Sequence, residues 1–267
     1  MKVILAGGSN STNLYQDHVK EFGLVKLYSI LNEKNLISRW DENHPLMVDS
    51  GAHSWNKETI TPVGMKRGTK LKPAREFLDW YMNYIKENKD RPFIFVEFDV
   101  YGHLSLEEIN ESYEYVKSLG GKSKFIRVYH PTLDGGDLSM LKKWIDEGQE
   151  YIGVGNDSTE ILDDIFKLTR DKVMVHGFAM TKPRLMQKYP FFSVDSTSPL
   201  STVIFGRYSR PIMSFDERKD IIDRKSIKCF DDDYNRLRKA VIEVKETEDL
   251  FTELWTKKGV TWPELKF

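Results

Sequence analysis

Short apolar runs alternate with longer amphipathic stretches along the chain, and this alternation constrains the fold more than any other feature. Eight runs, each ending at or near a Gly, Asp or His, cover residues 3–8, 46–51, 93–100, 124–130, 151–155, 172–178, 191–196 and 203–206. Continuous hydrophobicity of this kind is typical of parallel strands that are buried on both faces. Each run is therefore predicted to be a strand.

Helical periodicity marks the stretches between these runs. They cover residues 19–31, 74–85, 106–119, 138–145, 158–168 and 182–188, and a strongly charged helix is expected at 232–255. Ser105 is expected to cap the helix at 106–119, because Glu108 follows it three residues later as in a capping box. Ser158 is expected to cap the helix at 158–168.

Eight strands that alternate with helices predict an α/β fold, specifically a (β/α)8 TIM barrel. An open doubly wound sheet is the alternative, but no G-x-G-x-x-G motif opens a helix after the first run. We expect a catalytic barrel at residues 1–210. A helical C-terminal extension at 211–267 is expected to pack on it, so that the chain forms a single domain overall.

Composition restricts the partners and the compartment. The 267 residues carry a net charge of −1, so any site for a polyanion must be a local basic patch. Cys229 is the only cysteine, which excludes an internal disulfide and a cysteine-rich zinc site. No run reaches membrane-spanning length, and the apolar start of the chain is too short for a signal peptide. A cytoplasmic protein without a membrane partner is expected.

Polar residues at the carboxyl ends of the predicted strands are the candidates for chemistry, since reactive groups of TIM barrels lie there. They are Asp49, Glu97, Asp99, His130, Gly153 to Gly155, His176 and Asp195. Asp195 stands out, because apolar residues precede it and a turn of small hydroxylated residues follows. An acid at a strand end more often caps a helix. The recurrence of this arrangement at several strand ends favours a shared catalytic mouth.

Three chemistries suit such a set of residues. Two carboxylates can perform a glycosidic displacement, one as nucleophile and the other as acid and base. His and Asp side chains can instead bind a divalent metal, although the first run carries no H-x-H motif. A phosphate-binding barrel is the third option, but the seventh run ends in an acid and lacks a bare glycine loop. Glycosidic chemistry is favoured.

Three segments carry a resemblance to a known family. V-D-S-G-A-H at 48–53 resembles the D-S-G-G-F-Q segment of tRNA-guanine transglycosylases, and Y-I-G-V-G-N at 151–156 is similar to their glycine-rich base-binding strand. H-G-F-A-M-T-K-P-R-L-M at 176–186, with Y-P-F-F-S-V-D-S-T-S at 189–198, resembles the region that leads to their nucleophile. Over residues 1–210 the chain most resembles the phage DpdA-like DNA-guanine transglycosylases, which insert 7-deazaguanine bases into DNA.

This resemblance implies a cofactor-free and metal-free pentosyltransferase that exchanges guanine in DNA for a 7-deazaguanine derivative. It would act in the cytoplasm, which is the host cytoplasm for a phage-encoded enzyme. By position, Asp195 would be the nucleophile that attacks C1′, and Asp49 would be the acid and base. Asp99 would read the donor groups of guanine, because a carboxylate accepts two hydrogen bonds.

The base site implied by the resemblance has further members. Gly153 and Val154 would contact the base through their backbone. Ser50 and His53 follow Asp49 and would line the same site. Trp55 and Tyr101 are candidates to stack there, with packing beneath the loops as the alternative.

Basic residues near the strand ends are the candidates for binding the nucleic-acid backbone. Four of them, Lys66, Arg67, Lys70 and Lys72, lie in the long polar loop at 56–72, and Arg207 follows the last run. His176 has no role implied by the resemblance. We expect it to be structural, donating a hydrogen bond to a backbone carbonyl, or to orient a carboxylate.

One departure from the family and the residues at the strand ends leave alternatives open. The tRNA enzymes carry a Cys/His zinc site after the barrel, which one cysteine cannot supply. DNA is therefore the expected partner, with tRNA as the alternative. A metal-dependent hydrolase that uses His53, Asp49, His130 and Asp195 is a second alternative. A nucleic-acid-binding relative without turnover is the third.

Overall fold

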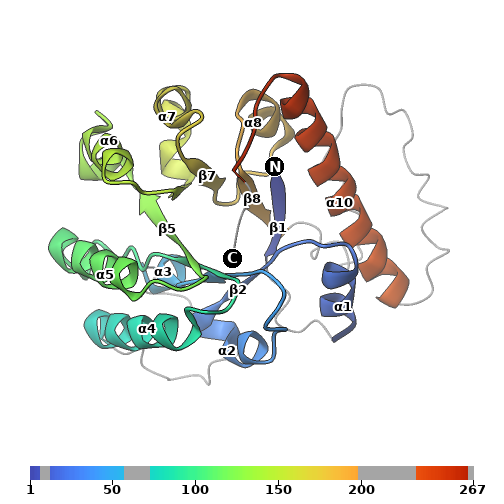
Figure 1. The fold of residues 1–267 in the computed structure, drawn as a ribbon, viewed down its shortest axis with the longest axis horizontal. Helices are drawn as coiled ribbons and strands as arrows, with labels where there is room; N and C mark the ends of the chain where they lie inside the picture. The colour runs from blue at the N-terminus through green and yellow to red at the C-terminus, as the bar shows by residue number, and fades with distance from the viewer. Residues whose placement is uncertain (7–12, 57–72, 198–232, 264–267) are drawn as a thin grey trace. The chain divides into compact units, whose positions relative to one another are not determined.

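The computed structural model describes residues 1–6, 13–56, 73–197 and 233–263. Within them, eight strands follow in chain order around a closed barrel, which confirms the predicted TIM-type fold. The strands are β1 Lys2–Ala6, β2 Lys26–Ser29, β3 Leu46–Asp49, β4 Phe93–Val96, β5 Lys124–Tyr129, β6 Tyr151–Val154, β7 Met174–Gly177 and β8 Ser193–Ser196. The barrel closes where β1 pairs in parallel with β8, seen in blue and brown in Figure 1.

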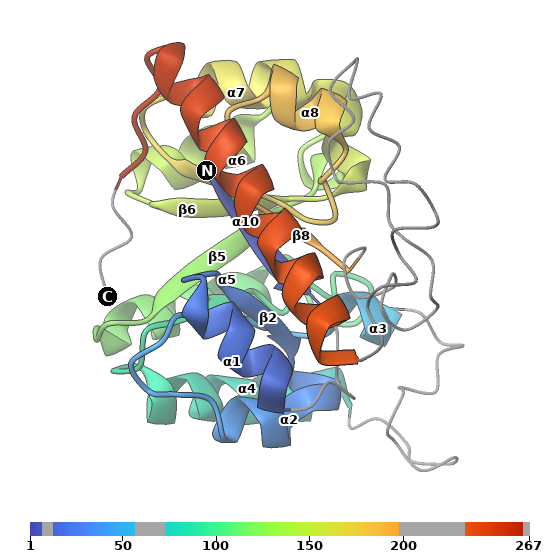
Figure 2. The same cartoon turned by 90° about the vertical axis from the view of Figure 1, so that its right-hand side faces the viewer.

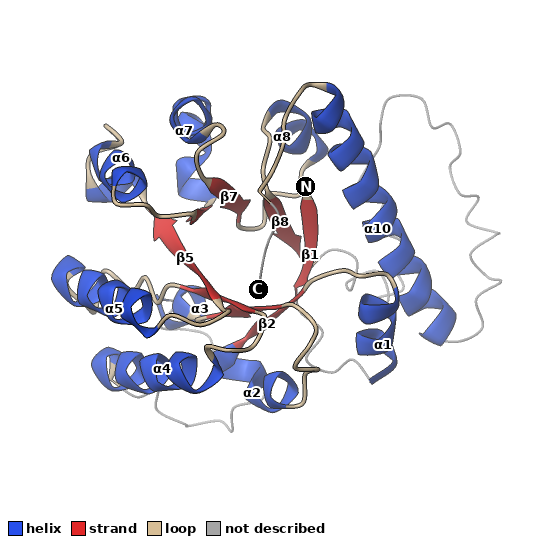
Figure 3. Ribbon diagram, in the orientation of Figure 1, coloured by secondary structure: helices blue, strands red, loops and turns tan. Residues whose placement is uncertain are grey.

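Helices alternate with these strands, and Figure 3 distinguishes the two by colour. The α-helices are α1 Asn13–Glu21, α2 Ile30–Ser38, α3 Ala52–Asn56, α4 Ala74–Asn88, α5 Leu106–Leu119, α6 Ser139–Asp146, α7 Leu162–Thr169, α8 Pro183–Lys188 and α10 Asp233–Lys257. Two 3-10 turns, η1 Pro131–Leu133 and η2 Asn156–Ile161, follow β5 and β6. None of the described helices is long and apolar enough to cross a membrane.

By internal contacts the chain divides into two compact units. The first comprises residues 1–26 and 129–263, and the second comprises residues 27–128. The predicted boundary at residue 210 lies outside the described residues.

Aromatic packing forms much of the core in each unit. In the first, the ring of Phe166 on α7 stacks on Tyr189 at 5.2 Å between centroids and meets Phe191 edge-on at 4.9 Å. In the second, Trp55 packs against Phe77 at 5.0 Å and against Phe98 at 5.4 Å. Trp55 is buried in this cluster. Its side chain thus packs beneath the loops, the alternative to stacking on a base.

The predicted helix at 19–31 is wrong. Helix α1 ends at Glu21, β2 covers Lys26–Ser29 and α2 begins at Ile30. Gly23 has a φ of 63°, the left-handed conformation that ends helices. The sequence pattern misled because Lys26 is fully buried within a strand, where its Nζ donates to the carbonyl oxygen of Leu5 at 3.0 Å.

The helix start signals gave one confirmed prediction and one wrong one. Ser105 caps α5, where its hydroxyl accepts from the Glu108 N–H and its own N–H donates to the Glu108 carboxylate. Ser158 does not cap a helix: it is buried in η2, and α7 begins only at Leu162. The C-terminal helix, expected at 232–255, is α10.

The order of the predicted strands differs from the observed order by one strand from β3 onward. Because β2 lies inside the stretch predicted as a helix, the run expected to be the seventh strand is β8. The run at 203–206, expected to be the eighth strand, lies outside the described residues. The remaining runs coincide with β1 and β3 to β7.

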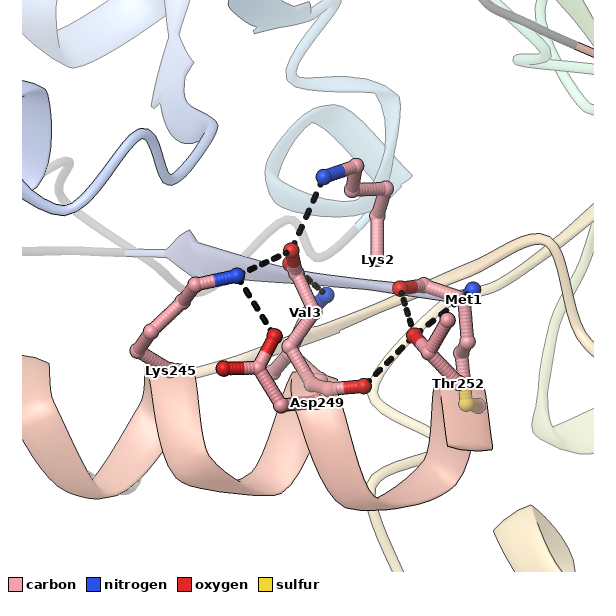
Figure 4. Close-up of polar contacts among 7 residues, drawn as sticks. Met1, Lys2, Val3, Lys245, Asp249 and Thr252 are labelled. Atoms are coloured by element: carbon pink, nitrogen blue, oxygen red, sulfur yellow. Dashed lines mark hydrogen bonds and ion pairs between the residues drawn. The ribbon is translucent and has the colours of Figure 1, made fainter. Parts of the chain in front are cut away.

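Helix α10 packs along β1 and α1, as Figure 2 shows. Glu248 on α10 is buried and accepts hydrogen bonds from the Val3 N–H at 3.0 Å and from Lys2 Nζ at 2.8 Å. Thr252 contacts the backbone of Met1 one turn later (Figure 4). The Glu248 carboxylate thus satisfies a backbone donor of β1, the strand against which α10 packs.

We predict that Glu248→Ala lowers the free energy of unfolding by about 1–3 kcal/mol, because it leaves the buried Val3 N–H without an acceptor. Urea unfolding followed by circular dichroism measures the change. Glu253→Ala on the same helix is the matched control, since its exposed pair with Lys257 contributes less than about 0.5 kcal/mol. Equal losses in the two variants would contradict this role of Glu248.

Candidate active site at the strand ends

Asp195 lies near the carboxyl end of β8 with its side chain only 12% exposed. Because side chains alternate along a strand, Ser193 and Asp195 share one face of β8 and Val194 points to the other. The strand Ser193–Ser196 is buried along its whole length although three of its four residues are polar. Such a strand requires polar partners, since an unsatisfied buried polar group is costly.

The Asp195 carboxylate is held through one oxygen. Its Oδ1 accepts a hydrogen bond from the Ala179 N–H at 2.8 Å and lies 3.3 Å from Nε2 of His176. The contact with Nε2 has ion-pair distance but not hydrogen-bond alignment, and Nε2 has no hydrogen-bond partner. Ala179 has a φ of 55°, a left-handed conformation that costs a non-glycine residue about 1–3 kcal/mol.

His176 connects Asp195 to two further buried side chains. Its Nδ1 lies 2.7 Å from the Ser193 hydroxyl, and that hydroxyl also contacts the Tyr151 hydroxyl. His176, Ser193 and Tyr151 are essentially inaccessible to solvent. The prediction that His176 donates to a backbone carbonyl is wrong, because the ring lies between Ser193 and Asp195. We call Tyr151, Ser193, His176 and Asp195 the polar chain.

Strand register explains why these residues meet. His176 on β7 is the direct partner of Ser193 on β8, and Gly153 on β6 is the direct partner of His176. Gly177 follows His176 at a crowded position, where an added Cβ would lie 2.8 Å from the ring of Phe191 and 2.9 Å from Cβ of Met180. A larger residue at this position would therefore displace Phe191 or Met180.

Gly153 and Val154 are buried in β6, as the predicted base-binding strand requires. The Val154 carbonyl already accepts the Phe178 N–H at 2.9 Å, which ties the end of β6 to the loop after β7. A direct contact of either residue with a base stays a prediction.

His130 forms a second polar pair in the first unit. It follows β5, and its Nδ1 lies 2.8 Å from Oδ2 of Asp157 in η2. Partial burial acts to raise the pKa of Asp157, but the hydrogen bond and charge of His130 outweigh it and lower that pKa below its usual value. Asp157 thus orients the His130 ring. No sequence pattern indicated Asp157, which lies beyond the strand end.

Asp49 is the last residue of β3 in the second unit and is half-buried. The Ser50 hydroxyl donates to the Glu97 carbonyl at 2.8 Å and so ties the end of β3 to the residue after β4. Gly51 has a φ of 83°, and an added Cβ would lie 2.4 Å from Leu31. The predicted base contact His53 lies on α3 and is exposed.

Glu97 is buried directly after β4, in the second unit. Its carboxylate contacts Nε of Arg127 at 3.2 Å and accepts the Val128 N–H at 3.0 Å. Burial raises the pKa of Glu97 to about 7, while Arg127 and Val128 act in the opposite direction and Asp99 adds to the rise. Asp99 is half-buried near this pair. Burial, then the charges of Glu97 and Asp99, also raise the pKa of Tyr101.

The structure brings together part of the predicted set. Asp195 and His176 are in direct contact, with Gly153 beside them on β6, and all three belong to the first unit. Asp49, Ser50 and Asp99 belong to the second unit, so a joint site for the two aspartates, Asp49 and Asp195, stays a prediction. The predicted backbone-binding residues Lys66, Arg67, Lys70, Lys72 and Arg207 lie outside the described residues.

Sequence reasoning missed Ser193, Tyr151 and Arg127 as partners of the candidate residues. Ser193 carried a signal, since it stands two residues before Asp195 and must share its face in a strand. The partners on neighbouring strands carried none, because register decides which residues meet.

Among the described residues, no group of three or more His, Cys, Asp or Glu side chains is arranged to hold a metal ion. One surface hollow of about 370 Å³ lies between α4 and α5, and another of about 340 Å³ lies beside α7 and residues 260–263. Neither is lined by Asp49, Asp99 or Asp195.

No model of a known protein family and no curated protein matches this sequence. The fold is therefore defined by the structure itself: a closed barrel of eight parallel strands with alternating helices and a C-terminal helix, the TIM-barrel type.

We predict that the unfolding free energy of the protein falls between pH 5 and pH 8 relative to that of Glu97→Gln, by on the order of 1–3 kcal/mol. The raised pKa means that the folded state holds the Glu97 proton more tightly than the unfolded chain does. The associated stability is present below the unfolded pKa and is lost as the pH rises through about 7. Urea unfolding at several pH values measures it, and parallel profiles for the two proteins would contradict it.

Proposed function

We propose that the protein is a DNA-guanine transglycosylase, which exchanges guanine in DNA for a 7-deazaguanine derivative through a covalent aspartyl–deoxyribose intermediate. The observation that carries the proposal is the Asp195 carboxylate at the end of β8. Its Oδ1 is held by Ala179 and faces His176, whereas Oδ2 makes no hydrogen bond or ion pair with the described residues. One oxygen is fixed and the other is left for attack, which suits a nucleophile.

In the first step of the proposed reaction, Oδ2 of Asp195 attacks C1′ of the target nucleotide. The bond from C1′ to N9 of guanine breaks, and guanine leaves with a proton supplied by Asp49. In the second step, N9 of the incoming base attacks C1′ and gives its proton to Asp49. The ester bond to Asp195 breaks, and the carboxylate is regenerated. Two displacements retain the configuration at C1′.

Asp99 is the proposed reader of guanine. The pyrimidine edge of guanine offers N1–H and an exocyclic amine, and one carboxylate can accept both hydrogen bonds. Asp99 is half-buried near the buried Glu97 at the end of β4. Partial burial supports this role, because it reduces competition from water while leaving the carboxylate accessible.

The proposed substrate is DNA from which the target nucleotide leaves the base stack, at a cost of a few kcal/mol. A net charge of −1 fits weak and salt-sensitive binding through a local patch. A tRNA substrate would use the same residues and the same chemistry, so parallel assays on DNA and tRNA decide between the two.

The metal-dependent hydrolase has less support. It requires His130 as a ligand together with His53, Asp49 and Asp195. Its four proposed ligands form no metal-binding group among the described residues. No contact in the described residues favours a relative without turnover over an enzyme.

We predict that the protein incubated with guanine-containing DNA forms a covalent complex that survives denaturing electrophoresis. Asp195→Ala and Asp195→Asn should abolish the band, because neither side chain supplies a carboxylate nucleophile. Asp163→Asn on the exposed face of α7 is the matched control and should leave the band unchanged. The proposal fails if the wild-type protein forms no such complex and exchanges no labelled guanine.

We further predict that Asp49→Asn lowers the rate of guanine exchange by about 100- to 10,000-fold, the range expected for loss of a general acid and base. The measurement is the release of labelled guanine from DNA. Asp137→Asn, in the exposed loop after β5, should keep the wild-type rate. An Asp49→Asn rate within threefold of wild type would rule out this role.

A further inference from the structure

We infer that His176 is a positioning residue, which presents an N–H to Oδ1 of Asp195 and thereby assigns the attack on C1′ to Oδ2. The inference rests on the proposed function, in which Asp195 is the nucleophile. Ser193 and Tyr151 hold the imidazole in the required orientation and tautomer.

The hydrogen-bond inventory of the polar chain fixes its direction. An ionised Asp195 carboxylate has only acceptors, so the nitrogen that faces it must carry a proton to be stabilising. With the proton on Nε2, Nδ1 accepts from the Ser193 hydroxyl at 2.7 Å. The Ser193 oxygen in turn accepts from the Tyr151 hydroxyl. If Nδ1 carried the proton and donated to Ser193, the lone pair of Nε2 would face the acceptor oxygen of the carboxylate.

Burial makes the direction of the hydrogen bonds in the polar chain energetically important. His176 and Ser193 are fully buried, and Tyr151 is 1% exposed, so water cannot replace a missing partner. Nε2 is buried without a hydrogen-bond partner, and Asp195 lies 3.3 Å away. Hydrogen bonds at active sites are often long before the substrate binds and tighten as charge develops. Nε2 is therefore a donor held ready beside the carboxylate.

Ala179 and His176 converge on the same oxygen. The Ala179 N–H donates to Oδ1 at 2.8 Å from a left-handed backbone conformation, and Nε2 approaches the same atom. Both groups are directed at Oδ1, and Oδ2 is left without a hydrogen bond or ion pair to the described residues. When the ester bond breaks in the second step, the two donors stabilise the negative charge that returns to the carboxylate.

A matched pair of variants separates the two contacts of the imidazole. In His176→Gln the side-chain amide reaches the position of Nε2 and can still donate to Asp195. In His176→Asn the shorter amide reaches only the position of Nδ1 and meets Ser193. Ser193→Ala and Tyr151→Phe test the outer members of the polar chain, and Ser112→Ala, a buried serine on α5, is the control for removing a core hydroxyl.

The expected kinetic result is a kcat about 100-fold lower in His176→Asn, with the KM for DNA unchanged, since loss of one well-placed donor costs about two orders of magnitude. His176→Gln should recover to within about tenfold of wild type. Ser193→Ala should fall between the two, and Ser112→Ala should match wild type. If His176→Asn and His176→Gln retain equal kcat values, the inference is overturned, while covalent trapping by the wild type would still support the proposed function.

Nuclear magnetic resonance of protein with 15N-labelled histidine gives a result that does not depend on activity. The chain has six histidines, and loss of one signal set in His176→Gln identifies His176. The inference requires a protonated Nε2 and an unprotonated Nδ1, with the Nε2 signal shifted in Asp195→Asn. An unprotonated Nε2 would overturn it, whatever the outcome of the covalent assay. The spectra also report whether each variant is folded.

Discussion

The parallel register of β7, β8 and β1 is the constraint on which the rest of the first unit depends. His176 lies opposite Ser193, and Asp195 lies opposite Ile4. A slip of one residue would turn Ser193 and Asp195 to the other face and bring Val194 into their place. His176 would then lie opposite an apolar residue and lose its hydrogen-bond partner Ser193. The register that pairs β1, β7 and β8 is therefore also the register that brings the residues of the polar chain together.

The same interaction explains why this barrel tolerates a polar strand. Buried polar groups are costly when they lack partners and specify a structure well when each has one. In the polar chain, Ser193 contacts both Tyr151 and His176. Nε2 of His176, which makes no hydrogen bond, faces Asp195. The polar chain replaces apolar core residues and leads to one carboxylate at a strand end. Such a departure from an apolar core is expected at a functional site.

The sequence predicted the barrel because hydrophobic runs of parallel strands are continuous, and it located Asp195 because the acid ends such a run. It did not predict β2, because a buried Lys26 interrupts the apolar pattern and Gly23 was not recognised as a helix end. The contact between His176 and Ser193 was also missed, since it depends on register between strands. Trp55 shows a further limit of sequence-based prediction. An aromatic residue near a strand end has the same sequence pattern whether it packs in the core or binds a base.

The most direct test of the account is mass spectrometry of nucleosides from DNA incubated with the protein and a set of 7-deazaguanine bases. We expect one or more of these bases to appear as its deoxynucleoside, with loss of an equal amount of deoxyguanosine and release of free guanine. Asp195→Ala should give only the four unmodified nucleosides. Unmodified nucleosides from the wild-type protein with every base offered, and no free guanine, would contradict the proposed base exchange.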